Sequence, residues 1–221
     1  MIFPGAKVYI FDMDSTLIHA DCDVTWKSFA VRHKLAPESA IAQADAFYED
    51  YKNGCLDPVA FMRFQLAEFT GNTPEEMAEV CQCHFEEFIR PACYPEALAL
   101  VKTLKEQGIP TAILTSTNTR IAAPTAAYFG VDKLMGTELA VENGRFTGSI
   151  AGEYAVRAGK IAPATEFAAL HGATLAETAY FGDSINDLDL LQVVGFPVAA
   201  NPCPELRKIA EEKNWRIVDF K

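Results

Sequence analysis

The chain has 221 residues, of which 19 are lysine or arginine and 30 are aspartate or glutamate, so its formal net charge is −11. Half of the residues are hydrophobic and 22% are charged, which is typical of a globular protein and excludes a disordered or fibrous chain. The acidic balance also argues against a nucleic-acid partner, because binding to a phosphate backbone requires a net positive surface.

The sequence carries no signal for a membrane or for secretion. No stretch approaches the roughly 20 consecutive apolar residues of a membrane span, and the first residues lack the basic and apolar regions of a secretory signal. Six cysteines are too few for a disulfide scaffold. We therefore expect a cytoplasmic protein with reduced thiols and no membrane partner.

The first predicted element is a buried strand, and a helical insertion follows it. The apolar run Lys7–Phe11 ends in acidic residues, which is typical of a parallel strand buried on both faces. No stretch of Asp23–Ile89 resembles a strand, whereas Asp57-Pro58 and Thr73-Pro74 are typical helix starts. The apolar positions at helical spacing in this region are Phe61, Met62, Leu66 and Phe69. We interpret the insertion as three or four helices that form a small lobe, whose apolar stripe packs its own core or supports a dimer.

Strands and helices alternate in the rest of the chain. The further predicted strands are Thr111–Thr115, Thr178–Phe181, Phe196–Ala199 and Arg216–Val218. The predicted helices are Pro95–Lys105, a segment from Asn118 or Thr119 to Gly130, a segment from Lys160 to His171, and Leu188–Val193. Asn143-Gly144, between two short apolar runs, predicts a β-hairpin.

This order of elements predicts an α/β fold, because alternating strands and helices form parallel sheets with helices on both faces. We expect a Rossmann-like doubly wound parallel sheet with an inserted all-α cap domain and a β-hairpin. The core domain would comprise residues 1–17 and 92–221, and the helical cap residues 18–91. The sequence leaves open whether the protein is a monomer or a homodimer.

Two pairs of aspartates follow predicted strands. Asp12 and Asp14 come directly after the first strand, and residues two apart in an extended chain point the same way. Asp183 and Asp187 follow the strand Thr178–Phe181, one helical turn apart. Taken alone, either pair is equally typical of a solvated turn or a helix cap.

Together the two pairs indicate a metal site, because the carboxyl ends of parallel strands lie on one side of a sheet. Four carboxylates in a crevice would repel one another and take up protons, unless a divalent cation binds between them. Ligation by oxygen atoms alone points to magnesium. Thr115 and Lys160 would then act on an anion beside the metal, the first as a hydroxyl donor and the second as a positive charge.

These pieces resemble the four motifs of the haloacid dehalogenase superfamily: Asp12-Met13-Asp14-Ser15-Thr16, then Thr115, Lys160 and Gly182-Asp183-Ser184-Ile185-Asn186-Asp187. The helical insertion directly after the first motif resembles the cap of its phosphoserine phosphatase-like branch. The segment around Asn143-Gly144 is similar to a hairpin of that branch.

The resemblance implies a magnesium-dependent phosphatase that works through an aspartyl-phosphate. It makes Asp12 the nucleophile, and Asp14 the acid that protonates the leaving oxygen and later the base that activates water. It makes Thr115 and Lys160 the groups that hold the phosphoryl oxygens. The implied metal ligands are the Asp12 carboxylate, the Asp14 backbone carbonyl and Asp183, with Asp187 and Asn186 reaching the ion through water. Ser116, next to Thr115, is a further implied phosphate ligand.

The substrate is less well defined by the resemblance. Asp21 lies where phosphoserine phosphatases have a glutamate for the substrate amine, and Arg63 lies near their carboxylate-binding arginine. Both are equally typical of a solvated helix surface. A small amine-bearing phosphomonoester is therefore expected, with phosphoserine and an amino-alcohol phosphate such as histidinol phosphate as candidates.

Two other functions remain open at this point. A phosphotransferase would pass the phosphoryl group from Asp12 to an alcohol instead of water, and Asp14 would serve as its base equally well. A catalytically silent metal-binding regulatory module would lack a key residue, whereas Asp12, Asp14, Lys160 and Asp183 are all present.

Overall fold

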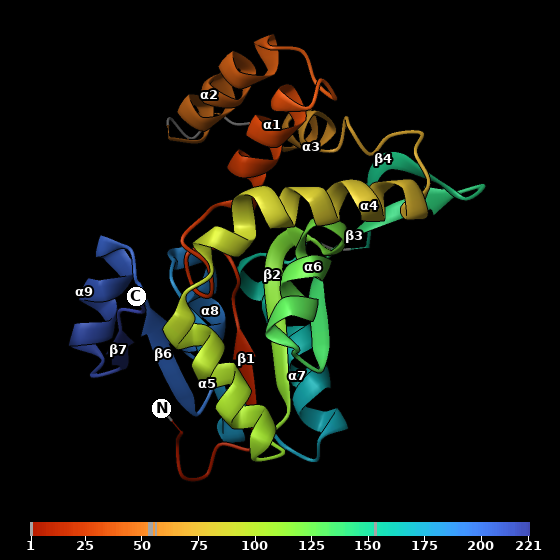
Figure 1. Ribbon diagram of the computed structural model, residues 1–221. Helices are drawn as coiled ribbons and strands as arrows, with labels where there is room; N and C mark the ends of the chain where they lie inside the picture. The colour runs from red at the N-terminus through yellow and green to blue at the C-terminus, as the bar shows by residue number, and fades with distance from the viewer. Residues whose placement is uncertain (1, 53–54, 56, 153) are drawn as a thin grey trace.

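The computed structural model of the protein describes residues 2–52, 55, 57–152 and 154–221. In these residues seven strands form one sheet with the order β4-β3-β2-β1-β5-β6-β7 (Figure 1). The strands are β1 (Val8–Phe11), β2 (Thr111–Asn118), β3 (Lys133–Glu142), β4 (Arg145–Ala151), β5 (Thr178–Gly182), β6 (Phe196–Ala200) and β7 (Arg216–Val218). All neighbours are parallel except β3 and β4, which are antiparallel.

Helices cover both faces of the sheet, as predicted for a doubly wound α/β fold. The helices are α1 (Cys22–Arg32), α2 (Ser39–Lys52), α3 (Pro58–Gln65), α4 (Pro74–His84), α5 (Pro95–Glu106), α6 (Thr119–Phe129), α7 (Ile161–Leu170), α8 (Leu188–Leu191) and α9 (Pro204–Glu212). Along β1, Tyr9 and Phe11 pack in the cluster that contains α5 and α6, whereas Val8 and Ile10 pack in the cluster that contains α7, α8 and α9. This alternation follows from the two-residue repeat of a strand.

The ends of two predicted elements were wrong. Strand β2 continues past Thr115 to Asn118, because this end of the strand pairs with β3, where Asn118 lies opposite Thr137. The predicted hairpin at Asn143-Gly144 is confirmed as the antiparallel pair of β3 and β4, and β3 also pairs in parallel with β2, so the hairpin extends the sheet.

Helix α8 ends at Leu191 and not at Val193. The chain must turn toward Gly195, whose N–H donates a 2.8 Å hydrogen bond to the Leu175 carbonyl. A Cβ at Gly195 would lie 1.9 Å from the carbonyl oxygen of Ala176, so only glycine fits this close approach.

The insertion after β1 leaves and re-enters the core through two paired segments. Ile18 forms an antiparallel bridge with Cys93. On either side of this bridge, the N–H of His19 donates to the Ala92 carbonyl at 2.7 Å and the N–H of Tyr94 donates to the Leu17 carbonyl at 3.0 Å. Helices α1, α2 and α3 lie beyond the carboxyl ends of the strands, and α4 lies across these ends in contact with α6 (Figure 1).

The apolar side chains of the insertion are buried in the same cluster as those of the sheet. Trp26, Phe69 and Met77 of the insertion belong to one buried cluster with Phe11 and Ile113 of the sheet. Of the predicted apolar stripe, Leu66 and Phe69 are buried, and Phe61 and Met62 are half-buried. The stripe therefore packs largely inside the chain.

A buried ion pair sets α1 against the end of α3. The Lys27 ammonium lies 2.7 Å from Glu68 and donates a 2.5 Å hydrogen bond to the Phe64 carbonyl, and both charged side chains are 5% exposed or less. The Trp26 indole N–H donates to the same Glu68 carboxylate at 3.0 Å. Burial lowers the pKa of Lys27, and Glu68 opposes this effect. The sequence analysis did not identify this pair, since its two members lie 41 residues apart.

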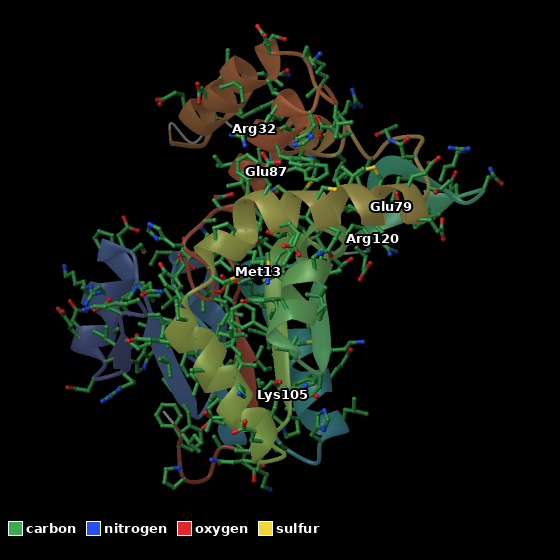
Figure 2. All side chains as sticks on the ribbon, viewed as in Figure 1. Met13, Arg32, Glu79, Glu87, Lys105 and Arg120 are labelled. Carbon is green, nitrogen blue, oxygen red and sulfur yellow. The ribbon has the colours of Figure 1, made fainter. Side chains whose placement is uncertain are left out.

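A surface ion pair lies above the end of α4. Figure 2 shows Arg32 of α1 beside Glu87, which follows α4, and their side chains are hydrogen bonded. His33 Nε2 lies 2.7 Å from the same carboxylate. Such exposed pairs contribute little to stability, because water and salt screen them.

His84 gives the fold a pH-dependent stability. Its ring is fully buried between Trp26 and Phe29, and Nε2 lies 3.1 Å from the Thr25 hydroxyl. Burial lowers the pKa of His84 from the ordinary 6.5 to about 4, against the opposing charge of Glu87. The unfolded chain takes up a proton below pH 6.5, and the folded chain does so only near pH 4. We expect the contribution of His84 to the free energy of unfolding to fall by about 3 kcal/mol between these values, while the buried aspartates with a raised pKa act in the opposite direction.

Urea denaturation at a series of pH values measures this loss. The variant His84→Gln has no titrating ring, so the stability of the wild type relative to this variant should fall by about 3 kcal/mol from pH 6.5 to pH 4. His171→Gln, at the exposed end of α7, serves as the control and should retain the wild-type slope. Equal slopes for wild type and His84→Gln would contradict the prediction.

The remaining sequence expectations concern thiols and membranes. All six cysteines are free in the structure; Cys22 and Cys81 are buried, and Cys55 and Cys83 are exposed. In the part of the chain that the structure describes, no helix combines the length and apolar character needed to cross a membrane.

Candidate active site

The loop after β1 carries two aspartates into one cavity at the carboxyl edge of the sheet. Asp12 directly follows β1 and is 6% exposed, and Asp14 is half-buried. Both line a cavity that encloses about 620 Å³ of space, part of it open to solvent. The chain then turns at Ser15, whose φ of 58° is left-handed, and Asn201 Nδ2 donates a 3.1 Å hydrogen bond to the Ser15 carbonyl. This turn leads the chain away, so both carboxylates stay at the edge of the sheet.

Lys160 connects the two predicted aspartate pairs. Its ammonium lies 2.7 Å from Asp12 Oδ1 and 2.7 Å from Asp187 Oδ1, and only 2% of its side chain is exposed. Burial alone would lower the pKa of Lys160, but the charges of Asp12 and Asp187 outweigh it and raise the pKa. Lys160 is therefore a fixed positive charge beside the carboxylate of Asp12.

The turn after β5 holds Asp183 and Asp187 close to the end of the strand. Asp187 Oδ2 accepts hydrogen bonds from the backbone N–H groups of Asp183 at 3.1 Å and Ser184 at 3.2 Å. Tyr180, inside β5, donates from its hydroxyl to Asp187 Oδ1 at 2.5 Å. A Cβ at Gly182 would lie 2.6 Å from the Cβ of Asp187, so glycine at this position permits the tight turn.

The carboxylates of Asp12, Asp183 and Asp187 form a cluster that suits a divalent cation. One oxygen atom from each lies within 4.8 Å of the others. Burial raises the pKa of Asp12 to about 7, although Lys160 opposes it; burial and the charges of Asp12 and Asp187 raise the pKa of Asp183 to about 9. These raised pKa values indicate that the ammonium group of Lys160 does not fully balance the charges of the carboxylates. Carboxylate oxygens are hard donors, which bind Mg²⁺ or Ca²⁺ preferentially. The donor set fits a divalent metal.

Metal binding should be measurable without turnover. At a Mg²⁺ concentration of 100 times Kd, binding stabilises the folded state by about 2.7 kcal/mol, which corresponds to a rise of about 5–10 °C in Tm. Thermal unfolding with Mg²⁺ and with EDTA measures this shift. Asp183→Asn should lose most of it, whereas Asp45→Asn, at an exposed position of α2, should keep it. An unchanged Mg²⁺ shift in Asp183→Asn would contradict the assignment.

Asp14 occupies a different environment from Asp12. Its carboxylate accepts hydrogen bonds from the Cys22 backbone N–H at 2.8 Å and from the Thr117 hydroxyl at 2.6 Å. Burial raises the pKa of Asp14, and the nearby charge of Asp21 adds to the effect. A raised pKa suits a carboxyl group that carries a proton to a leaving group.

The predicted phosphate ligands divide into two groups. Ser116 and Asn186 line the cavity with Asp12 and Asp14. Thr115 is fully buried beneath it: its hydroxyl accepts a 3.1 Å hydrogen bond from the Thr117 N–H and lies 3.5 Å from Asp14. A direct contact between Thr115 and a phosphoryl group stays a prediction.

The two predicted cap residues do not line the same cavity. Asp21 lines the cavity that contains Asp12, and its carboxylate caps α1 by accepting from the N–H groups of Asp23 and Val24. Arg63 is exposed and lines another space, between α3 and strand β4, together with Phe61, Met62 and Ile150. A contact of both Asp21 and Arg63 with one substrate stays a prediction.

Sequence reasoning missed three side chains of this site. Thr117 binds Asp14, Tyr180 binds Asp187, and Asp23 lines the cavity beside Asp21. A tyrosine within a strand buried on both faces was the available signal for Tyr180, because a buried hydroxyl needs a partner. Asp23 had no comparable signal, since an acidic residue in the first turn of a helix is ordinary.

Comparison with known proteins identifies the relatives of this chain. The model of the haloacid dehalogenase-like hydrolase family matches residues 9–192. A histidinol-phosphatase of Neisseria meningitidis serogroup C is 39% identical over 217 residues, which cover 96% of this chain and 98% of that protein. A phosphoserine phosphatase of Mycobacterium tuberculosis is 29% identical over 216 residues, which cover 96% of this chain and 70% of that protein.

Solved structures agree with these sequence relatives. A protein of unknown function from Bordetella pertussis Tohama I superimposes with a TM-score of 0.88 at 33% identity, over 97% of this chain and 98% of that one. A substrate-bound phosphoserine phosphatase shares the fold, with a TM-score of 0.67 at 20% identity over 98% and 93% of the two chains. The match over residues 9–192 and the relatives that span nearly the whole chain place this protein in the haloacid dehalogenase-like hydrolase family, as an enzyme of its phosphatase type.

Proposed function

We propose that this protein is a Mg²⁺-dependent phosphatase that hydrolyses a small amine-bearing phosphomonoester of the histidinol phosphate type through an aspartyl-phosphate on Asp12. The observation that carries the proposal is the juxtaposition of Asp12 with Lys160 and Asp183 in a cavity whose mouth is acidic. The 39% identity to a histidinol-phosphatase supports the choice of substrate.

In the first step, a carboxylate oxygen of Asp12 attacks phosphorus. The new O–P bond forms as the bond from phosphorus to the substrate oxygen breaks, and Asp14 gives its proton to that leaving oxygen. Lys160, already 2.7 Å from Asp12, stabilises the negative charge on the phosphoryl oxygens. The products are the free alcohol and phosphorylated Asp12.

In the second step, water attacks the phosphorus of the aspartyl-phosphate. Asp14, now ionised, takes a proton from the water, and the bond between Asp12 and phosphorus breaks. Inorganic phosphate leaves, and Asp12 and Asp14 return to their starting states. Thr117, which donates to Asp14 at 2.6 Å, keeps this carboxyl group directed into the cavity in both steps.

Asp12, Asp183 and the backbone carbonyl of Asp14 are the proposed ligands of Mg²⁺, with Asp187 and Asn186 contributing through water. When bound, the ion supplies positive charge that lets an anionic phosphoryl group approach anionic side chains. Asp187 has a second task, because it holds Lys160 and is itself held by Tyr180.

The charges around the cavity favour an amine over an amino acid as substrate. Asp21 and Asp23 line the cavity and would attract an ammonium group. Among the described residues that line this cavity, Lys160 is the one cation, and it is bound to Asp12 and Asp187. The carboxylate of phosphoserine would therefore find no free cationic partner, which favours histidinol phosphate.

A substrate panel tests the proposal. Phosphate release is measured with Mg²⁺ from L-histidinol phosphate, O-phosphoserine, phosphoethanolamine and p-nitrophenyl phosphate. We expect turnover of more than one monoester, with the highest kcat/KM for histidinol phosphate and none in EDTA. Adding alcohols such as ethanol or glycerol and searching for their phosphate esters tests the phosphotransferase alternative. A protein that binds Mg²⁺ and releases no phosphate would instead be a regulatory module.

The proposal also includes a cytoplasmic location for the enzyme. Its six cysteines are free, and thiols remain reduced in that compartment.

A further inference from the structure

A second cavity adjoins the active-site cavity on the side of α3 and the β3–β4 hairpin. It is narrow, with a free volume of about 20 Å³, and we refer to it as the inner cavity. Past Phe61, Met62 and Ile150, which line both spaces, it opens into a wider space with a free volume of about 390 Å³. Asp23 and Ser116 line both cavities, so the two spaces meet between these side chains. A substrate whose phosphate lies at Asp12 can therefore extend its leaving group into the inner cavity.

Apolar and polar side chains both line the inner cavity. The apolar ones include Phe61 and Met62 of α3, and Leu139 and Ile150 of the hairpin. Phe61 and Met62 are only half-buried, although each is large and hydrophobic. Apolar walls with a few polar groups between them are typical of a pocket for a small organic ligand.

Asp23 is an unpaired carboxylate at the entrance of this cavity. No described residue donates a hydrogen bond to it, and Lys27, one turn further along α1, is bound to Glu68 instead. Burial and the charges of Asp21 and Asp14 raise the pKa of Asp23 to about 8, against the opposing charge of Lys27. A ligand cation beside Asp23 would balance this charge.

Gln65 is an unpaired amide inside the cavity. Its side chain lines the inner cavity and is 9% exposed, and its oxygen Oε1 is buried without a hydrogen-bond partner among the described residues. A buried amide oxygen without a partner is unfavourable, so such groups usually await a ligand or a water molecule.

We propose that Asp23 and Gln65 bind the leaving group of the substrate: Asp23 binds its ammonium group, and the Gln65 amide oxygen accepts the N–H of a flat heteroaromatic ring lying against Phe61 and Met62. The inference rests on the proposed phosphatase function and specifies its substrate class. That class is a phosphate ester of an amino alcohol that carries an aromatic ring with an N–H donor.

Three substrates separate the parts of this site in steady-state kinetics. L-histidinol phosphate has the ammonium group and the ring, phosphoethanolamine has the ammonium group without the ring, and p-nitrophenyl phosphate has no ammonium group. Asp23→Asn should lower kcat/KM for histidinol phosphate by about 30- to 100-fold, mainly through KM, because a charged hydrogen bond is lost. The fall for p-nitrophenyl phosphate should be less than about threefold.

Gln65→Leu tests the ring contact. It should lower kcat/KM for histidinol phosphate by about tenfold and affect phosphoethanolamine clearly less, because only the first substrate offers a ring N–H. Asp45→Asn and Gln43→Leu repeat the same changes at exposed positions of α2 and serve as matched controls. Asp21→Asn compares the neighbouring carboxylate, and its effect on histidinol phosphate should be smaller than that of Asp23→Asn.

A measurement on the wild-type enzyme keeps the test independent of variants that fail to fold. Histamine carries both an ammonium group and an imidazole ring, whereas ethylamine carries only the ammonium group. As inhibitors of p-nitrophenyl phosphate hydrolysis, histamine should bind at least about tenfold more tightly than ethylamine.

The outcomes distinguish this inference from the proposed function. If the wild type releases phosphate from no monoester, or if Asp12→Asn retains full activity, the phosphatase proposal fails. If wild-type activity depends on Asp12 but Asp23→Asn and Gln65→Leu change all substrates equally, the leaving-group site alone is overturned. Equal inhibition by histamine and ethylamine, or a larger effect of Asp21→Asn, would also overturn it.

Discussion

Replacing Asp12 by asparagine is expected to lower kcat for every phosphomonoester by about 10⁴-fold or more. The asparagine amide has nearly the shape of the carboxylate, but it lacks the anionic oxygen that forms the bond to phosphorus. The loss should be the same for substrates with good and poor leaving groups, since the nucleophile serves all of them. Phosphate release with Mg²⁺ measures the effect.

The fold of the Asp12→Asn variant should remain intact. Asp12 lies in a loop and contributes one of two carboxylate contacts to Lys160, while the contact to Asp187 remains. Circular dichroism and thermal unfolding check this point, and Asp45→Asn controls for the loss of one negative charge. Phosphate release by Asp12→Asn at the wild-type rate would show that the nucleophile lies elsewhere.

Replacing Lys160 by methionine is expected to impair both stability and turnover. The change leaves Asp12 and Asp187 buried without their cation, and breaking a buried ion pair from one side costs about 3–5 kcal/mol. The kcat should fall by about 10³-fold, because a positive charge next to the phosphoryl oxygens is lost. Urea denaturation in EDTA and phosphate release in Mg²⁺ measure the two effects separately.

A surface lysine provides the matched control. Lys7 lies 2.6 Å from Glu177, but its side chain is 55% exposed, so Lys7→Met should leave stability and turnover close to those of the wild type. If Lys160→Met and Lys7→Met had similar small effects, the buried position of Lys160 would have no energetic consequence, and its assigned role would be wrong.

The parts of the site that sequence alone could predict depend on short-range geometry. Asp12 and Asp14 follow a strand, and Asp183 and Asp187 follow its parallel neighbour β5, so the carboxyl ends of two paired strands bring them together. An alternation of strands and helices along the chain predicts that neighbouring strands run parallel. For this reason the α/β fold and the cluster of aspartates around Lys160 could be predicted from the sequence.

The parts that could not be predicted depend on contacts between distant segments. The resemblance places Arg63 near the carboxylate-binding arginine of the family, yet Arg63 is exposed and does not line the cavity that contains Asp12. Gln65, two residues later, faces the inner cavity, because successive positions of a helix point to different sides. Only the packing of α3 against the hairpin decides which of these side chains meets a ligand.

The paired segments at Ile18 and Cys93 have an evolutionary consequence. The chain leaves and re-enters the sheet domain at segments that are hydrogen bonded to each other. The inserted segment between them, the excursion, can therefore be lengthened, shortened or exchanged without moving any strand of the sheet. The proposed catalytic residues Asp12, Asp14 and Lys160 lie outside the excursion, whereas Asp23 and Gln65 lie within it. Descendants of a common ancestor can thus acquire new specificities by altering one exchangeable module while an unchanged reaction centre is inherited.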